Sequence, residues 1–322
     1  MVGYRRNSLQ VSGSVALELH EITGDAGPTL AVLGGVHGDE PEGILACDAF
    51  VAELRELDRL SGRVLVLPRS NPMAVAADTR TSPDDGENLA RVFPGDPVGK
   101  PTEQVAHTIF REVITGSDAL VDLHSAGCVG IMPFFCGYHE LHDECARKAA
   151  GIAHAFAAPI TWAHDSAAAG RSLSAARSLG IPAIYVESGG GKQVEGEHLD
   201  GYLSGLFRVM AHLGMLEAPG WLTPPPAGRR IVRGGYGDID AAYPAEVAGR
   251  WVTRVSVGDD VRAGAVLGEL RDDEGRVIST IRAERDSCVM RLRRWCRVEA
   301  GEALAMLGPI SEPAPAAEPV LT

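Results

Sequence analysis

The sequence contains very little lysine: only Lys100, Lys148 and Lys192 occur among its thirty basic residues. The 322 residues also lack a basic surplus, since forty-three acidic residues leave a net charge of −13. This balance excludes non-specific nucleic-acid binding as the main activity, because such binding needs a positively charged surface. Hydrophobic residues make up 45% and charged residues 23% of the chain, which is typical of a globular protein rather than a disordered one.

Long apolar runs and paired-cysteine motifs are also absent. No stretch reaches the ~20 consecutive apolar residues that a membrane-spanning helix needs, so we expect no membrane partner. Arg5 and Arg6 are not followed by an apolar segment, and we therefore expect no signal peptide. The six cysteines form no CxxC pair, which favours reduced thiols and a cytoplasmic location.

A proline-rich segment at residues 219–228 (PGWLTPPPAG) indicates a linker. We predict a larger domain over residues 1–220 and a smaller all-β domain over residues 221–310. The remaining residues, 311–322, are rich in proline, alanine and glutamate, and we expect them to be disordered.

The first region alternates segments typical of strands and helices. We expect strands over 29–36, 63–67, 119–123 and 182–186, and helices beginning at 41, over 101–114, near 139–157 and over 201–216. This alternation predicts an α/β fold with a mixed sheet flanked by helices. Residues 251–298 instead alternate apolar and polar positions between glycine-marked turns, which predicts a compact all-β domain.

Polar residues follow three of the predicted strands. His37 and Glu40 follow the first strand, His124 follows the strand at 119–123, and Glu187 follows the strand at 182–186. Because open α/β sheets form their sites beyond the carboxyl ends of strands, we expect these side chains to converge. Two histidines and a glutamate are suitable ligands for a catalytic zinc ion, and a nearby carboxylate can act as general base.

Each of these residues has a simpler explanation when taken alone. Glu40 could merely favour the positive end of a helix dipole. His124 could be a hydrogen-bonded histidine at a strand end, and Glu187 a capping or surface carboxylate. The coincidence of all of them at strand ends favours a site.

Several motifs together resemble the succinylglutamate desuccinylase/aspartoacylase family of the zinc carboxypeptidase superfamily. The resemblance runs in order through the whole first region. It is carried by residues 34–43 (GGVHGDEPEG), 71–72 (NP), 80 (R), 85–95 (DGENLARVFPG), 122–124 (DLH) and 186–190 (VESGG). It implies a zinc-carboxypeptidase-like fold with one Zn²⁺ per chain.

The resemblance also implies individual roles. His37, Glu40 and His124 match the zinc ligands, and Glu187 matches the general base. Arg80 falls where the family has an arginine that polarises the scissile carbonyl. Arg91 falls where an arginine holds a substrate carboxylate, and Asn88 lies in the same substrate-binding block. One residue departs from the family pattern: Ala90 replaces an asparagine, which weakens the expected carboxylate contact or indicates a different substrate.

Other polar residues are weaker candidates. Arg171 and Arg177 both lie upstream of Glu187 and could contact the substrate, and we expect at least one of them on a solvated helix face; Arg171 is the predicted substrate contact. His139 and His142 have the spacing of a ligand pair, but without partners we expect them on a helix surface. His164 and Asp165 lie in a predicted loop and are candidates for the pocket mouth.

The second region resembles a biotinyl/lipoyl hammerhead, with residues 257–268 and 300–304 carrying the resemblance. A carrier domain needs an attachment lysine, and no lysine follows Lys192. We therefore predict that this domain is not a carrier. Whether its side chains reach the catalytic site is left open.

These observations predict a zinc-dependent amidohydrolase that removes the acyl group from a small N-acylated amino acid or related amine. Water activated by zinc would attack the amide, with Glu187 as general base. One alternative is a zinc carboxypeptidase acting on short peptides, and another is a non-enzymatic metal- or partner-binding module. An N-acetyl substrate is preferred over N-succinyl, because only one carboxylate contact is clearly indicated. The oligomeric state is left open.

Overall fold

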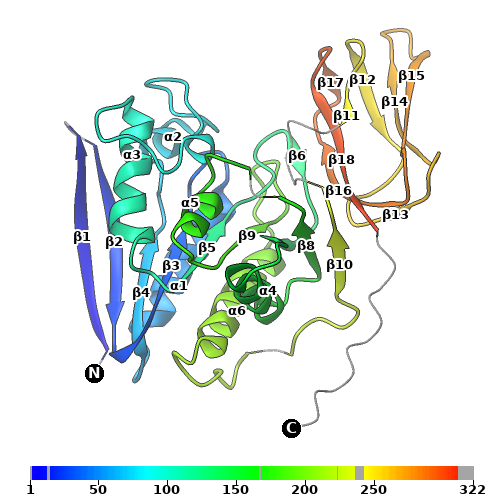
Figure 1. Ribbon diagram of the computed structural model, residues 1–322. Helices are drawn as coiled ribbons and strands as arrows, with labels where there is room; N and C mark the ends of the chain where they lie inside the picture. The colour runs from blue at the N-terminus through cyan, green and yellow to red at the C-terminus, as the bar shows by residue number, and fades with distance from the viewer. Residues whose placement is uncertain (1, 13–14, 167, 223, 236–242, 311–322) are drawn as a thin grey trace.

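The computed structural model contains one large sheet and two smaller ones (Figure 1). It describes residues 2–12, 15–166, 168–222, 224–235 and 243–310, so the predicted disordered tail at 311–322 lies outside the described residues. The strands of the large sheet are β1 (Gly3–Ser12), β2 (Val15–Thr23), β3 (Asp25–Leu33), β4 (Ser61–Leu67), β5 (Ala119–Leu123), β7 (Phe135–His139), β8 (Ile160–His164), β9 (Ala183–Glu187) and β10 (Arg230–Arg233). Their spatial order is β1-β2-β4-β3-β5-β9-β7-β8-β10.

The centre of this sheet is parallel, and its flanks are mixed. Strands β4, β3, β5 and β9 run in one direction, so their carboxyl ends meet at one edge. Strand β7 is antiparallel to β9, and β8 and β10 run parallel to β7. On the other flank, the hairpin β1–β2 adds two antiparallel strands. Because of this reversal between β9 and β7, the carboxyl ends of β7 and β8 lie away from the edge where β3, β5 and β9 end.

Helices cover both faces of the large sheet. On one face α1 (Pro41–Arg55), α4 (Glu144–Phe156) and α6 (Gly196–His212) pack against the sheet, and on the other α3 (Pro101–Ile109), the π-helical turn η2 (Phe110–Ile114) and α5 (Ser172–Ser178) do so. The apolar run of strand β3 is unbroken because both of its faces are covered. Leu30 and Val32 face the first helix layer, whereas Ala31 and Leu33 face the second. A strand buried on both faces needs apolar residues at every position.

The C-terminal region forms two antiparallel sheets. Their strands are β11 (Tyr243–Pro244), β12 (Gly249–Thr253), β13 (Asp260–Val261), β14 (Val266–Arg271), β15 (Val277–Arg282), β16 (Ser287–Arg293), β17 (Arg297–Val298) and β18 (Ala303–Pro309). One sheet has the order β11-β18-β16-β13 and the other β15-β14-β12-β17. The short strand β6 (Gly130–Ile131), from the first region, pairs with β16, while β10, after the linker, pairs with β8. The two regions therefore each contribute a strand to the other's sheet. We propose that the boundary between the two domains lies between residues 220 and 221.

The predicted fold class is confirmed: an α/β region with a mixed sheet is followed by a smaller β region. The four predicted strands all occur, with small differences at their ends. The hairpin β1–β2 and strands β7, β8 and β10 were not predicted. The helix expected near 139–157 begins only at Glu144, because residues 135–139 form β7. Among the described residues, no helix combines the length and the apolar character that a membrane crossing would need.

Candidate metal centre and active site

Glycines shape the loop that carries the first two predicted ligands. His37 and Glu40 lie between β3 and α1, and Glu40 is the residue that precedes the helix. A Cβ on Gly38 would lie 2.0 Å from the carbonyl oxygen of Ala74 in α2 (Pro72–Ala77), so only glycine allows this close approach. Pro41 then occupies the first turn of α1, where its missing N–H costs no hydrogen bond.

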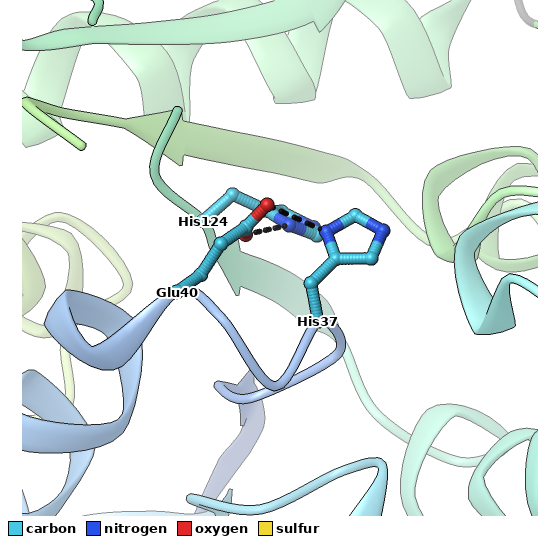
Figure 2. Close-up of side chains that lie close together, drawn as sticks. All are labelled: His37, Glu40 and His124. Carbon is cyan, nitrogen blue, oxygen red and sulfur yellow. Dashed lines mark hydrogen bonds and ion pairs between the residues drawn. The ribbon is translucent and has the colours of Figure 1, made fainter. Parts of the chain in front are cut away.

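The structure brings His37, Glu40 and His124 into one buried group (Figure 2). The Glu40 carboxylate lies between the two imidazoles: Oε1 is 2.7 Å from Nδ1 of His37, and Oε2 is 2.9 Å from Nδ1 of His124. One ligand atom from each residue lies within 4.8 Å of the others. All three side chains are buried. A compact His–Glu–His set of this kind has the donors that Zn²⁺ prefers.

The outer nitrogens of both imidazoles are held by neighbouring side chains. Nε2 of His37 lies 3.0 Å from Oδ1 of Asn88, and Nε2 of His124 lies 3.2 Å from Oδ1 of Asp122. These contacts at Nε2 hold the ring orientations in which Nδ1 of each imidazole faces Glu40. The set therefore fits a divalent cation. Asn88, predicted from the resemblance to contact substrate, lies here beside His37.

The charges of this group depend on one another. Burial opposes ionisation of Glu40, but His37 and His124 outweigh it and hold the pKa of this carboxyl well below its usual range. Burial also opposes the charge on His124, yet Asp122 and Glu40 raise its pKa well above the ordinary value. The group thus keeps a carboxylate in a buried position, which is the form that a metal ion needs.

Glu187, the last residue of β9, lines the same pocket. Its Oε2 atom is buried and has no hydrogen-bond partner among the described residues. Burial raises the pKa of this carboxyl well above its usual range. A carboxyl with a raised pKa can both accept and release a proton, which is what general acid–base chemistry requires.

Three arginines also line the pocket. Nη1 of Arg80 donates to Oε1 of Glu40 at 2.8 Å, which places this guanidinium directly beside the ligand group. Arg91 and Arg171 both donate to the carbonyl oxygen of Ala90, at 3.2 Å and 3.4 Å. The three predicted cationic residues therefore share one pocket, with Ala90 itself in the lining. Arg177 does not line this pocket but pairs with Asp143.

The prediction for His139 was wrong. It is the last residue of β7 and lines the pocket, where burial lowers its pKa to about 4. His142 is exposed in the bend before α4. His164 ends β8 and lines the pocket too, whereas Asp165 is exposed and accepts a hydrogen bond from the Gly235 N–H.

Sequence reasoning missed Tyr185 and the true position of His139. The strand-end rule failed because β7 and β8 run opposite to β9, so their carboxyl ends do not lie at the edge where Glu187 lies. The pocket instead extends across the face of the sheet from Glu187 toward Tyr185 and His164. A prediction of β7 and β8 with their direction would have been needed to find this extension.

The β region approaches the site through Arg291 on β16. This side chain is only 1% exposed, and its Nε and Nη1 have no hydrogen-bond partner among the described residues. A Cβ on Gly130 would lie 2.7 Å from Nε, so glycine makes room for the guanidinium. Burial lowers the pKa of Arg291 to about 10, and the charges of Arg80 and Glu187 act on it. Arg291 therefore lies near the site without being part of the pocket lining.

Comparison with protein families gives a match over most of the first region. Residues 26–213 match the family described as the succinylglutamate desuccinylase/aspartoacylase catalytic domain. A relative from Halomonas elongata, N-alpha-acetyl-L-2,4-diaminobutyric acid deacetylase, is 33% identical over 305 residues. The alignment covers 93% of this chain and 87% of that relative.

Solved structures with the same architecture cover almost the whole chain. The product-bound structure of the ectoine utilization protein EutE (DoeB) from Ruegeria pomeroyi has a TM-score of 0.84 and 27% identity, and covers 95% of both chains. A succinylglutamate desuccinylase/aspartoacylase from Rhodobacter sphaeroides has a TM-score of 0.82 and 29% identity, over 95% of this chain and 94% of its own. The similarity therefore includes the C-terminal β region.

Proposed function

The chain belongs to the succinylglutamate desuccinylase/aspartoacylase family, and from this premise we propose that it is a zinc-dependent deacylase. The reaction would be hydrolysis of the amide bond of a small N-acylated amino acid or related amine. The observation that carries this proposal is the pocket itself, in which the His37–Glu40–His124 group, Glu187 and Arg80 lie together. A metal-binding or partner-binding module would not require a buried carboxyl with a raised pKa beside such a group.

His37, Glu40 and His124 would hold one zinc ion. When bound, zinc supplies Lewis-acid activation of water and of the amide carbonyl. Asn88 and Asp122 would keep the two imidazoles in the tautomer that directs Nδ1 to the ion, through the contacts at Nε2.

Glu187 would be the group that moves protons. Its carboxylate would take a proton from the attacking water, and its carboxylic acid would later give that proton to the nitrogen of the leaving amine. Both steps require a carboxyl whose two forms are close in free energy near neutral pH, and the raised pKa of Glu187 favours this. Arg80 would donate a hydrogen bond to the carbonyl oxygen as negative charge develops on it.

Arg91 and Arg171 would bind the carboxylate of the amino acid. Asn88, which lies in the same segment as Arg91, is a further predicted substrate contact. A planar guanidinium matches a carboxylate with two parallel hydrogen bonds. We propose N-acetyl rather than N-succinyl substrates, and this choice is supported by the acetylated compound in the name of the Halomonas relative. N-α-acetyl-L-2,4-diaminobutyrate is the first compound to assay.

A panel of substrates tests this function directly. The zinc-loaded protein should hydrolyse N-acetyl amino acids faster than N-succinyl amino acids and much faster than dipeptides. Faster cleavage of dipeptides would instead support the carboxypeptidase alternative. A cytoplasmic location, and the lack of nucleic-acid and membrane partners, stay predictions from the sequence, and the oligomeric state stays open.

A further inference from the structure

The pocket contains a second polar cluster that the proposed hydrolytic chemistry does not use. It consists of His139, His164 and Tyr185, which come from the neighbouring strands β7, β8 and β9. The register of the strands places all three on one face of the sheet, since His139 pairs with His164 and Gly137 pairs with Tyr185. Glu187, two residues beyond Tyr185 on the same strand, lies on this face as well.

Tyr185 contacts His164 across an intervening strand. Gly137 makes this contact feasible, because a Cβ there would lie 2.1 Å from Cε1 and 2.6 Å from the hydroxyl oxygen of Tyr185. The tyrosine ring therefore lies directly over the backbone of β7. Its hydroxyl oxygen is 2.6 Å from Nε2 of His164, and the two rings are stacked with 19° between their planes. Any larger residue at position 137 would displace the ring.

The other ring nitrogen of His164 is buried and has no partner in the part of the chain that the structure describes. The side chain is 2% exposed, and Nδ1 has no hydrogen-bond partner among the described residues. Burial, followed by the charges of His139 and Arg171, lowers the pKa of His164 to about 3, so the ring is neutral at neutral pH. Burial raises the pKa of Tyr185 well above its ordinary value, and its hydroxyl therefore keeps its proton.

These contacts determine which nitrogen carries the proton. A neutral imidazole has one N–H donor and one acceptor nitrogen. If the Tyr185 hydroxyl donates to Nε2, the tyrosine proton has an acceptor and Nε2 has a donor, and the proton of His164 lies on Nδ1. We assign this tautomer because the opposite one leaves the buried tyrosine proton without an acceptor among the described residues. Nδ1 is then a buried donor that needs an acceptor from a ligand.

We propose that His164 donates a hydrogen bond from Nδ1 to the carboxylate of the amino-acid part of the substrate, beside Arg171. Tyr185 would act as a positioning residue that holds His164 in the required tautomer. This inference rests on the proposed deacylase function and narrows its substrate class to N-acyl amino acids with a free carboxylate.

The surroundings favour an anionic acceptor. Arg171 lines this part of the pocket, and its charge acts on both His139 and His164. A donor beside a guanidinium fits a carboxylate, whereas a cationic group would be repelled. A buried donor that a ligand leaves unpaired lowers the affinity for that ligand, so the site would discriminate against substrates without this acceptor.

The test compares N-α-acetyl-L-2,4-diaminobutyrate with its α-carboxamide, in wild type and in variants at position 164. His164→Leu removes the donor and should raise KM for the acid about 10- to 100-fold, with kcat/KM for the carboxamide changed less than about twofold. His164→Asn, whose side-chain amide can replace the Nδ1 donor, should restore at least part of the preference for the acid. Equal losses on both compounds, or no loss in the leucine variant, would overturn the proposal.

Two further variants test the role of Tyr185. Tyr185→Phe should reduce the preference for the acid about tenfold, because the tautomer is no longer fixed. Gly137→Ala removes no polar group but displaces the tyrosine ring, and it should give the same change. The matched control is His142→Asn, an exposed position before α4, which should behave as wild type. Unchanged preference in both Tyr185→Phe and Gly137→Ala would exclude the positioning role.

Calorimetry separates this proposal from the deacylase function. Wild type that hydrolyses no N-acyl amino acid of the substrate panel contradicts the proposed function, but binding can still be measured on the full-length protein. L-2,4-diaminobutyrate should then bind at least about tenfold more tightly than its carboxamide, and His164→Leu should remove the difference. Equal binding of the two compounds to wild type would overturn the role of His164. The asparagine variant serves for the same measurement if the leucine variant does not fold.

Discussion

Glu40 and His124 are 84 residues apart in the chain, yet Oε2 of Glu40 lies 2.9 Å from Nδ1 of His124. The other carboxylate oxygen lies 2.7 Å from Nδ1 of His37. The parallel strands β3 and β5 produce this proximity, because their carboxyl ends meet at one edge of the sheet. One carboxylate thereby joins histidines from two strand ends into a single buried group.

Replacement of the proposed general base should separate turnover from metal binding. Glu187→Gln keeps the size of the side chain but cannot move a proton, so kcat should fall about 10²- to 10⁴-fold. Zinc content, measured by atomic absorption, should be unchanged because Glu187 is not in the ligand group. Glu53→Gln, on the exposed side of α1, is the matched control and should keep wild-type activity. Near-normal turnover in Glu187→Gln would exclude the assigned role.

The contact between Asn88 and His37 should affect metal affinity. Asn88→Ala leaves Nε2 of His37 without its partner, and loss of such an outer contact weakens metal binding about 10- to 100-fold. Competition with a chromophoric zinc chelator measures this change, with Asn7→Ala on the edge strand β1 as control. A raised KM with unchanged zinc affinity would instead support the substrate-binding role predicted from the sequence.

The buried histidines should make the folded state sensitive to acid. His139 and His164 have folded-state pKa values of about 4 and about 3, both below the ordinary value of 6.5. At pH values between the folded-state pKa of each histidine and 6.5, the unfolded chain binds a proton that the folded chain does not. The free energy of unfolding therefore rises with pH in this range. The contribution is complete above about pH 6.5 and is lost as the pH falls toward the folded-state values.

A variant isolates this effect from that of other groups. His164→Phe removes one of the two histidines. Between pH 5 and 6, the slope of its free energy of unfolding against pH should therefore be smaller than that of wild type by about 1.4 kcal/mol per pH unit. Urea titrations of wild type and variant at several pH values give the two slopes. The groups that act on His164 are His139 and Arg171, and both remain in the variant. Identical slopes would show that His164 is protonated in the folded protein.

Arg291 should stabilise the folded protein less than an apolar residue of the same length would. Its Nε and Nη1 lack partners among the described residues, and buried guanidinium nitrogens without partners carry a desolvation cost. Arg291→Met should therefore raise the free energy of unfolding by about 1–3 kcal/mol, measured by urea denaturation. Arg262→Met, at an exposed position, is the control. A less stable Arg291→Met protein would show that this guanidinium has a stabilising partner.

The metal-ligand group was more accessible to sequence reasoning than the rest of the pocket. His37 and Glu40 belong to one local motif, and His124 and Glu187 follow apolar runs that are easy to identify as strands. Parallel strands then bring these ends together without further information. The structural placement of these four residues follows from local pattern and one general rule.

The polar cluster at Tyr185 could not be predicted in this way. Its geometry depends on the reversal of direction between β9 and β7 and on a glycine at position 137, and neither has a local signal. Strand β7 (FCGYH) is short and contains a central glycine, which weakens the strand pattern. Arg291 was also hidden, because its approach depends on how the β region packs against the first region.

Removal and return of zinc tests the central claim most directly. The purified protein should contain about one zinc per chain, lose hydrolysis of N-α-acetyl-L-2,4-diaminobutyrate after dialysis against a chelator, and regain it when one equivalent of zinc is added. His37→Ala, which lacks one ligand, should not be rescued by the same addition. Full hydrolysis by chelated protein with less than about a tenth of an equivalent of metal would contradict the account.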